Sequence, residues 1–124
     1  MSISSNSSIH ALLFGLSEDL AGELMTPLSK LCTHIDQVRN HLSTVATCGA
    51  QVIFCGANTD VVSKLRETKP DASIVVVSRH PEVSGWLDSI EAGATDYCAA
   101  PFEIAQVQWI LESSMRAIQL PVSA

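Results

Sequence analysis

Ser-Ile-Val-Val-Val-Ser, at residues 73–78, is a continuous, mostly β-branched run in which apolar and polar positions do not alternate. Such a run is typical of a strand covered on both faces, as the strands of parallel sheets are. Two further apolar runs, at residues 9–14 and 51–55, are closed by Gly15 and Gly56. These three segments predict the centre of a buried sheet.

Helical patterns separate these strands. Residues 17–31 start with a capping Ser17 and repeat leucine at spacings of four, four and three, although Pro27 should kink or break this helix. Further helices are expected over residues 40–48, 58–69, 81–93 and 103–118, and weaker strands over 33–39 and 95–98. The alternation predicts an α/β fold, a three-layer, doubly wound (βα)5 parallel sheet whose ligands sit at the carboxyl ends of its strands.

The composition describes one globular domain with an acidic surface. The chain has 124 residues, 13 acidic against 7 basic ones, a formal net charge of −6 and 47% hydrophobic residues. This balance argues against a nucleic-acid surface, and no apolar run approaches the roughly 20 residues that span a bilayer. We expect a flexible leader at 1–8, a single domain at 9–120 and a stub at 121–124 toward a possible downstream effector domain.

Cysteines and histidines are scattered along the chain. The cysteines are Cys32, Cys48, Cys55 and Cys98. They form no CxxC pair. Their even number leaves disulfide bonds possible, but a domain of this size does not need them. Apolar-flanked cysteines favour free thiols in a reducing cytoplasm. The histidines are His10, His34, His41 and His80. They share no ligand spacing, so the sequence predicts no metal site.

Residues 91–102 read EAGATDYCAAPF and follow the strand at 73–78. This region resembles the second half of response-regulator receiver domains, which end the fourth strand with Ser or Thr and then carry EAGAxDYxxKPF. The resemblance extends over nearly the whole chain in element order and length, and it is specific from about residue 73 to 103. It implies a CheY-like fold with strand order 2-1-3-4-5 and a cis peptide bond before Pro101.

The resemblance also assigns the positions of the receiver's phosphorylation chemistry. The two acids that hold Mg²⁺ would fall on Gly15 and Leu16, and the phosphoacceptor on Cys55, or on Gly56 if the register slips by one. The conserved lysine falls on Ala100. Acceptor, metal ligands and lysine are therefore missing, which implies a degenerate pseudo-receiver that is not an enzyme and uses no cofactor.

Some receiver positions are retained, and nearby residues offer alternatives. Ser78 and the aromatic switch position Tyr97 keep the family's residue type. Glu18 and Asp19 could turn toward the vacated site, or could instead complement the positive start of their helix. The thiol of Cys55 could act as a redox or small-ligand sensor in the vacated pocket, or could be a small buried hydrophobe.

The outward faces of the last two helices suggest an interface. In the helix at 103–118 the apolar stripe is expected to face the core; it comprises Ile104, Val107, Leu111, Met115 and Ile118. Trp109 lies nearly opposite this stripe, and Glu112 and Arg116 share its face. In the preceding helix, Trp86 flanks an inward stripe of Val83, Leu87 and Ile90. An exposed tryptophan is the kind of anchor that interfaces use.

These expectations combine into one functional hypothesis and one alternative. The hypothesis is a receiver-like signal-transduction domain, the N-terminal regulatory domain of a bacterial transcriptional regulator. It would act by protein–protein interaction, as a homodimer through its last helix or docked on an effector domain, without aspartyl phosphorylation. The alternative is the thiol or small-ligand sensor at Cys55.

Overall fold

The computed structural model describes residues 9–39, 42–47, 49–79, 83–100 and 102–119, and for 83–84 and 114–119 it describes the backbone alone. The expected leader at 1–8, the stub at 121–124, Pro101 with its peptide bond, and the Arg116 side chain lie outside this description. The strands are β1 (His10–Phe14), β2 (His34–Val38), β3 (Val52–Cys55), β4 (Ser73–Ser78) and β5 (Asp96–Ala99). The helices are α1 (Glu18–Leu31), α2 (Leu42–Thr47), α3 (Thr59–Thr68), α4 (Val83–Ala92) and α5 (Ile104–Gln119).

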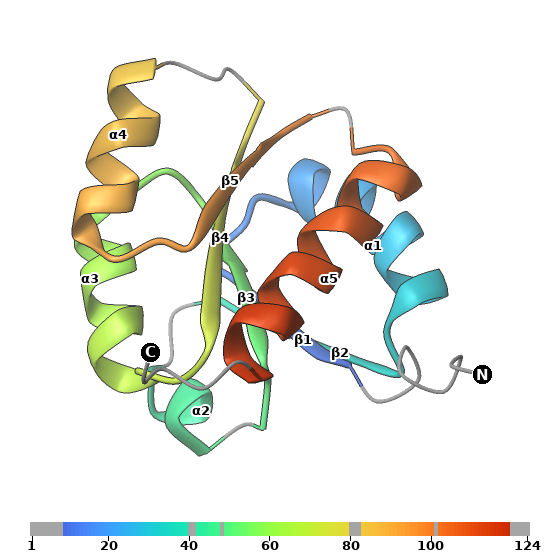
Figure 1. Ribbon diagram of the computed structural model, residues 1–124, viewed down its shortest axis with the longest axis horizontal. Coiled ribbons are helices and arrows are strands. Elements are labelled where there is room, and N and C mark those ends of the chain that lie inside the picture. Colours follow the sequence, from blue (N-terminus) through green and yellow to red (C-terminus); the bar gives the residue numbers. More distant parts are fainter. Residues whose placement is uncertain (1–8, 40–41, 48, 80–82, 101, 120–124) are drawn as a thin grey trace.

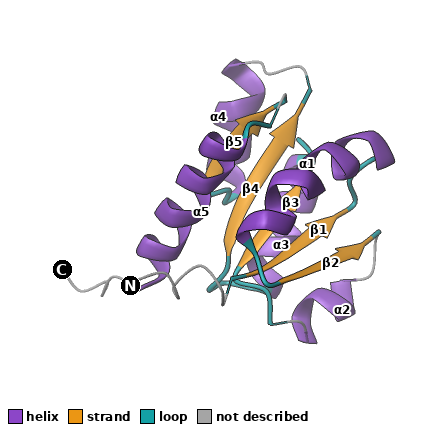
Figure 2. Cartoon of the chain, turned by 90° about the vertical axis from the view of Figure 1, so that its right-hand side faces the viewer, coloured by secondary structure: helices purple, strands orange, loops and turns teal. Residues whose placement is uncertain are grey.

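The five strands form one parallel sheet in the order β2-β1-β3-β4-β5, which confirms the predicted fold class and strand order. Helices α1 and α5 cover one face, and α2, α3 and α4 lie on the other (Figures 1 and 2). All the pairings are parallel, so the carboxyl ends of the five strands lie at one edge of the sheet.

The core has two layers because successive side chains of each strand point to opposite faces. In β4, Val75 and Val77 join the cluster under α1 and α5, while Ile74 and Val76 join the cluster under α2 and α3. All four are essentially inaccessible to solvent. Burying such a side chain contributes roughly 1.5–3 kcal/mol, which explains why β4 shows no polar alternation.

Local signals fix several helix ends. The Ser17 hydroxyl accepts a hydrogen bond from the Leu20 N–H at 3.3 Å, and the Asn58 side chain accepts from two N–H groups at the start of α3. Pro27 does not break α1, which runs without interruption to Leu31. Proline costs one internal hydrogen bond, but its ring is buried on the sheet-facing side, and the packing of that side holds the helix together.

A glycine and an arginine close the turn between α4 and β5. Gly93 has φ +122°, and a Cβ there would lie 3.1 Å from Cγ of Arg66. The Arg66 guanidinium donates to the carbonyl oxygens of Gly93, Pro70 and Ala72 at 2.8–3.1 Å. This clamp joins α3 to the chain segments that enter β4 and β5.

The orientation of α4 differs from the expected one. Leu87 and Ile90 were expected to face the core, but they are 53% and 38% exposed, whereas Ser89 is 1% exposed. The inward face instead carries small residues at helical spacing, Gly85, Ser89 and Ala92, which let the helix approach its neighbours closely. The apolar stripe is thereby left facing solvent.

The inward face of α5 is also shifted. Ile104 is exposed rather than buried, and Ile110 takes its place in the core beside Val107 and Leu111. Ile104 is the first residue of the helix, where the chain still enters from the β5 loop, so helical periodicity does not yet fix what it faces.

Candidate functional site at the carboxyl edge of the sheet

The register places the receiver-like positions together at the carboxyl edge. Phe14, the last residue of β1, pairs with Cys55 of β3, and Cys55 pairs with Val76 of β4. Strand β4 continues two residues further to Ser78, which pairs with Ala99 of β5. The carboxyl ends of β1, β3, β4 and β5 therefore lie at one edge of the sheet, as the predicted topology requires.

Neither acid-pair position can hold a cation through its side chain. Gly15 adopts a left-handed backbone with φ +66°, and its N–H donates to the Val38 carbonyl oxygen at 2.8 Å. A Cβ at this position would lie 3.4 Å from the Arg39 carbonyl oxygen. Leu16 is half-buried and packs against the core under α1 and α5. These residues build a tight turn where Mg²⁺ would need carboxylates.

The two possible phosphoacceptor positions differ in accessibility. The Cys55 side chain is 0% exposed and belongs to the core cluster under α2 and α3. Desolvation by burial raises the pKa of the Cys55 thiol to about 12. Gly56 is half-buried, and a Cβ built on it meets nothing within 4 Å. A side chain at Gly56 would therefore meet open space, whereas the Cys55 side chain is enclosed by the core.

The retained residues lie where the resemblance puts them. Ser78 is half-buried at the end of β4, and its carbonyl oxygen accepts a hydrogen bond from the Ala100 N–H at 2.9 Å. Tyr97 is half-buried and packs against the core cluster under α2 and α3. Ala100 brings no positive charge to the position of the family's lysine. Ser78 in β4 and Tyr97 in β5 thus keep the residue types that the resemblance implies.

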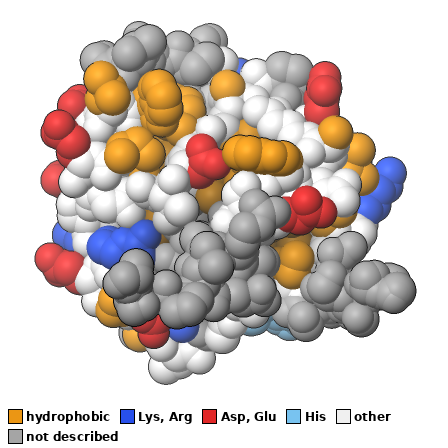
Figure 3. All heavy atoms as spheres, in the orientation of Figure 1, with side chains coloured by type: hydrophobic (Ala, Val, Ile, Leu, Met, Phe, Trp, Pro, Cys, Tyr) orange, Lys and Arg blue, Asp and Glu red, His pale blue; other side chains and the backbone are white. Residues whose placement is uncertain are grey.

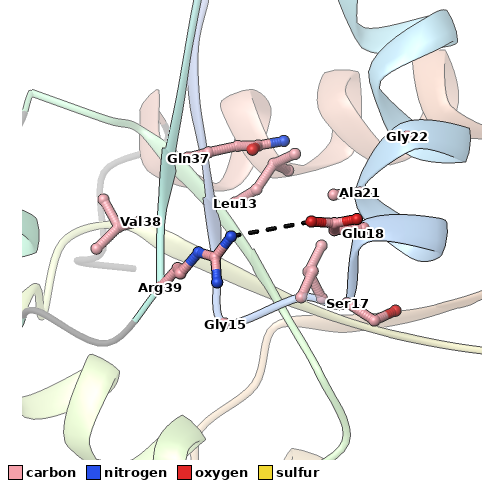
Figure 4. A pocket seen from close by; sticks show the side chains of 10 residues that line it. Leu13, Gly15, Ser17, Glu18, Ala21, Gly22, Gln37, Val38 and Arg39 are labelled. Carbon is pink, nitrogen blue, oxygen red and sulfur yellow. Dashed lines mark ion pairs between the residues drawn. The ribbon is translucent and has the colours of Figure 1, made fainter.

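A cavity of about 570 Å³ is lined by the acid-pair positions Gly15 and Leu16 but not by Cys55. Figure 4 shows it between the start of α1 and the ends of β1 and β2. Its lining residues are Leu13, Gly15, Leu16, Ser17, Glu18, Ala21, Gly22, Gln37, Val38 and Arg39. Any small-ligand site here would therefore be formed by α1 and β2, and the buried thiol would not reach it.

The two candidate substitute acids stay at the start of α1. Glu18 faces Arg39 across the cavity, with 3.9 Å between their charged atoms, and both side chains are almost fully exposed. Asp19 is exposed in the same first turn. Acids in a first turn stabilise the positive helix start, and an exposed ion pair contributes little. A stronger contact crosses the edge nearby, where Arg79 lies 2.8 Å from Glu23 of α1.

Two clusters of large apolar side chains are exposed on the outer face of α4 and α5. On α4 these are Trp86, Leu87 and Ile90, and on α5 they are Ile104 and Trp109, which is 63% exposed. Glu112 lies one turn from Gln108 and accepts its side-chain hydrogen bond at 3.3 Å. Figure 3 shows separate hydrophobic patches on the face formed by α4 and α5. The expected outward position of Trp109 is confirmed, and Trp86, which was expected at the flank of the α4 stripe, is 45% exposed.

The structure brings together two histidines that the sequence left dispersed. His10 and His34 are direct partners in the β1–β2 pairing, and Asp36 lies two residues along β2. Their side chains meet at the amino end of these strands, away from the receiver-like site. His41 and His80 lie outside the described residues. Only the strand register shows this proximity, because the histidines are 24 positions apart.

Comparisons with known proteins agree with the fold. No protein-family model matches the chain. It is 36% identical over 66 residues to the photosynthetic apparatus regulatory protein RegA of Rhodovulum sulfidophilum, a match that covers 53% of this chain but only 36% of the relative. The chain thus matches about a third of that relative's length.

Solved structures resemble the whole sheet and its helices. A response regulator from Thermotoga maritima superposes with a TM-score of 0.78 at 16% identity, covering 88% of this chain and 98% of that one. The beryllofluoride-activated NtrC4 receiver domain dimer gives 0.77 at 17% identity, covering 89% and 98%. Among the described residues, no helix is long and apolar enough to cross a membrane. The chain therefore has the fold of response-regulator receiver domains, and it resembles that family in sequence.

Proposed function

We propose that this chain is the receiver-like regulatory domain of a bacterial transcriptional regulator and that it signals by protein–protein interaction, without aspartyl phosphorylation. The observation that carries this proposal is the carboxyl edge itself. The fold and the switch positions Ser78 and Tyr97 are kept. The acid-pair positions hold Gly15 and Leu16, the acceptor position holds a buried thiol or a glycine, and the lysine position holds Ala100. The name of the RegA relative, a regulatory protein, supports the wider context.

Magnesium binding tests the first part of this proposal. Mg²⁺ requires hard oxygen ligands in nearly octahedral geometry, and the side chains at Gly15, Leu16 and Gly56 offer none. Isothermal titration calorimetry of the whole chain with Mg²⁺ should show no saturable heat. Saturable binding that disappears in Glu18→Gln or Asp19→Asn would show that these acids replace the missing pair, and it would overturn the proposal.

The interaction surface that we propose is the outer face of α4 and α5, and its partner is a second copy of the chain. Exposed tryptophans anchored among other apolar side chains are typical of interface centres. Trp86, Leu87 and Ile90 leave α4 with an apolar stripe that no described part of the chain covers. The structural likeness to a receiver domain dimer favours self-association over docking on an unrelated protein.

Sedimentation velocity measures this association directly. The wild-type chain should show a concentration-dependent dimer, and Trp109→Glu should shift it to monomer by placing a charge at the interface centre. Ser63→Glu is the matched control, because Ser63 is exposed on α3, a helix that does not belong to the proposed α4–α5 surface. A wild-type monomer, or a dimer that Trp109→Glu leaves intact, would contradict the proposed surface.

The thiol-sensor alternative receives no support from the site geometry. A reactive cysteine needs exposure and a lowered pKa, whereas Cys55 is fully buried and its pKa is raised to about 12. The described cysteines, Cys32, Cys55 and Cys98, are all free thiols, in keeping with the cytoplasmic location that we propose.

A further inference from the structure

Three side chains capable of binding a metal converge at the amino end of β1 and β2. His10 opens β1 and His34 opens β2, and the two are Cα partners in the parallel pairing. Asp36 follows His34 by two residues, so it lies on the same face of β2. Leu12 and Val38, two residues from His10 and from Asp36, pack on the side of α2 and α3. All three polar side chains therefore share that side.

The spacing of the ligand atoms suits a metal ion. One Asp36 oxygen lies 2.8 Å from His10 Nε2, and the other lies 3.3 Å from His34 Nε2. The ligand atoms of the three residues all lie within 4.8 Å of one another. Zn–N bonds of about 2.0–2.1 Å in a tetrahedron place two ligand atoms roughly 3.3 Å apart. Small side-chain movements would therefore bring all three onto one ion.

The backbone beneath the cluster is held from both neighbouring strands. On the β3 side, the His10 N–H donates to the Gln51 side-chain oxygen at 3.0 Å, and the His10 carbonyl oxygen accepts from the Gln51 N–H at 2.9 Å. On the β2 side, the Thr33 N–H and hydroxyl both donate to the Ile9 carbonyl oxygen. The first ligand is thus fixed by the sheet before any ion arrives, which lowers the ordering cost of binding.

The cluster is open to ions from solvent on one side. Side-chain exposure rises from 22% for His10 to 40% for Asp36 and 60% for His34. The two imidazole rings meet edge to face with centroids 4.4 Å apart, so their ring nitrogens approach the carboxylate from different directions. An ion could approach from the side of the exposed His34 and then bind the more buried His10 as well. Water would fill the remaining coordination positions.

We propose that His10, His34 and Asp36 bind a divalent transition-metal ion of the Zn²⁺ class. Imidazole nitrogen and one carboxylate suit Zn²⁺, Ni²⁺ or Co²⁺, whereas Mg²⁺ and Ca²⁺ require oxygen ligands. The ion would cross-link edge strand β2 to β1 and thereby stabilise the folded chain by mass action. This site does not depend on the proposed signalling role, because it lies at the opposite edge of the sheet.

The test is a Co²⁺ and Zn²⁺ titration of the whole, reduced chain. Co²⁺ should bind one to one with visible d–d absorption and without a thiolate-to-cobalt charge-transfer band, and Zn²⁺ should displace it. His34→Gln and Asp36→Asn should each weaken binding at least about tenfold, since even outer-shell substitutions typically cost 10–100-fold. Excess Mg²⁺ should not compete.

Two controls separate this site from adventitious binding. Gln37→Ala changes an exposed neighbour on β2 whose side chain lies on the other face, and the double variant His41→Gln, His80→Gln removes the remaining histidines. Both should bind Co²⁺ like the wild type, and circular dichroism should show all variants folded. Binding that is absent, unchanged in His34→Gln, lost in the controls or accompanied by a thiolate band would overturn the proposal. Absence of binding would mean that the three side chains interact with one another without forming a metal site.

Discussion

At the carboxyl edge of the sheet, four of the positions that the receiver resemblance assigns hold Gly15, Leu16, Gly56 and Ala100, none of which carries a charged side chain. At the amino edge, the same strand β1 and its neighbour β2 bring together two imidazoles and a carboxylate. The first edge is where the receiver fold normally concentrates chemistry. Topology thus fixes where strand ends meet, and the individual residues at those ends decide whether a reaction can occur there.

The largest expected effect distinguishes the two phosphoacceptor positions. Cys55→Asp would place a carboxyl group in a fully buried site without a polar partner, and it should destabilise the chain by at least about 4 kcal/mol. Gly56→Asp should change the free energy of unfolding by no more than about 0.5 kcal/mol, because a side chain there meets open space. Urea unfolding measures both, and soluble yield reports on Cys55→Asp if it fails to fold. Similar costs for the two variants would contradict the assigned burial.

Alkaline pH should weaken the fold through Cys55. Burial raises its pKa from 9.0 to about 12, so the unfolded chain loses this proton before the folded chain does. Below pH 9 the Cys55 thiol is protonated in both the folded and the unfolded chain, so the free energy of unfolding keeps its full value. As the pH rises from 9 toward 12, only the unfolded chain loses this proton, and the free energy of unfolding falls. At about pH 10.5 the loss amounts to roughly 2 kcal/mol.

The variant Cys55→Ala isolates the contribution of the Cys55 thiol to the pH dependence of the free energy of unfolding. Urea unfolding at about pH 8 and pH 10.5 should show a smaller drop for Cys55→Ala than for the wild type, whatever the variant's stability at the lower pH. Equal drops would mean that the thiol titrates normally in the folded chain. They would also revive the thiol-sensor alternative, since a normal thiol at this edge would be accessible to reagents.

The sequence predicted the fold well because its strands and caps are local signals. The β-branched run at Ser73–Ser78, the Ser17 cap and the left-handed Gly93 each act within a few residues. The strand ends then located the receiver-like positions. The inward faces of α4 and α5 were predicted wrongly: α4 packs small residues inward and exposes Leu87 and Ile90, and α5 exposes Ile104.

Contacts between distant segments could not be predicted in the same way. His10 and His34 show no ligand spacing, and they meet only through the register of β1 on β2. Likewise, Cys55 is buried and Gly56 is accessible because Cys55 is the last residue of β3 and its side chain faces the core. A one-residue change of register moves a side chain to the other face of a strand, which a single sequence leaves open.

A smaller effect is expected at Gly15. Its φ of +66° is costly for any residue with a Cβ, so Gly15→Ala should destabilise the chain by about 1–2 kcal/mol. Gly22→Ala is the matched control inside α1, where a Cβ meets nothing within 4 Å and should add about 0.5–1 kcal/mol of stability. Thermal unfolding of both variants tests this. A neutral Gly15→Ala would remove the structural reason for glycine at an acid-pair position.

The smallest effect is expected at the amino edge in the absence of metal. Asp36→Asn removes a partly exposed carboxylate beside two imidazoles, and such pairs contribute about 0.2–1 kcal/mol. Urea unfolding with a chelator present should show a change in this range. A much larger loss would mean that Asp36 is a structural centre of β2, and its replacement would then be unsuitable for measuring ion binding.

The central claim is that the receiver fold here has lost its phosphoryl chemistry. Intact mass spectrometry after incubation with acetyl phosphate and Mg²⁺ tests it most directly, with a receiver domain that retains its acceptor aspartate as the positive control. We predict that the control gains the mass of one phosphoryl group and that this chain keeps its unmodified mass. A stoichiometric phosphoryl adduct on this chain, lost on treatment with hydroxylamine as acyl phosphates are, would contradict the claim.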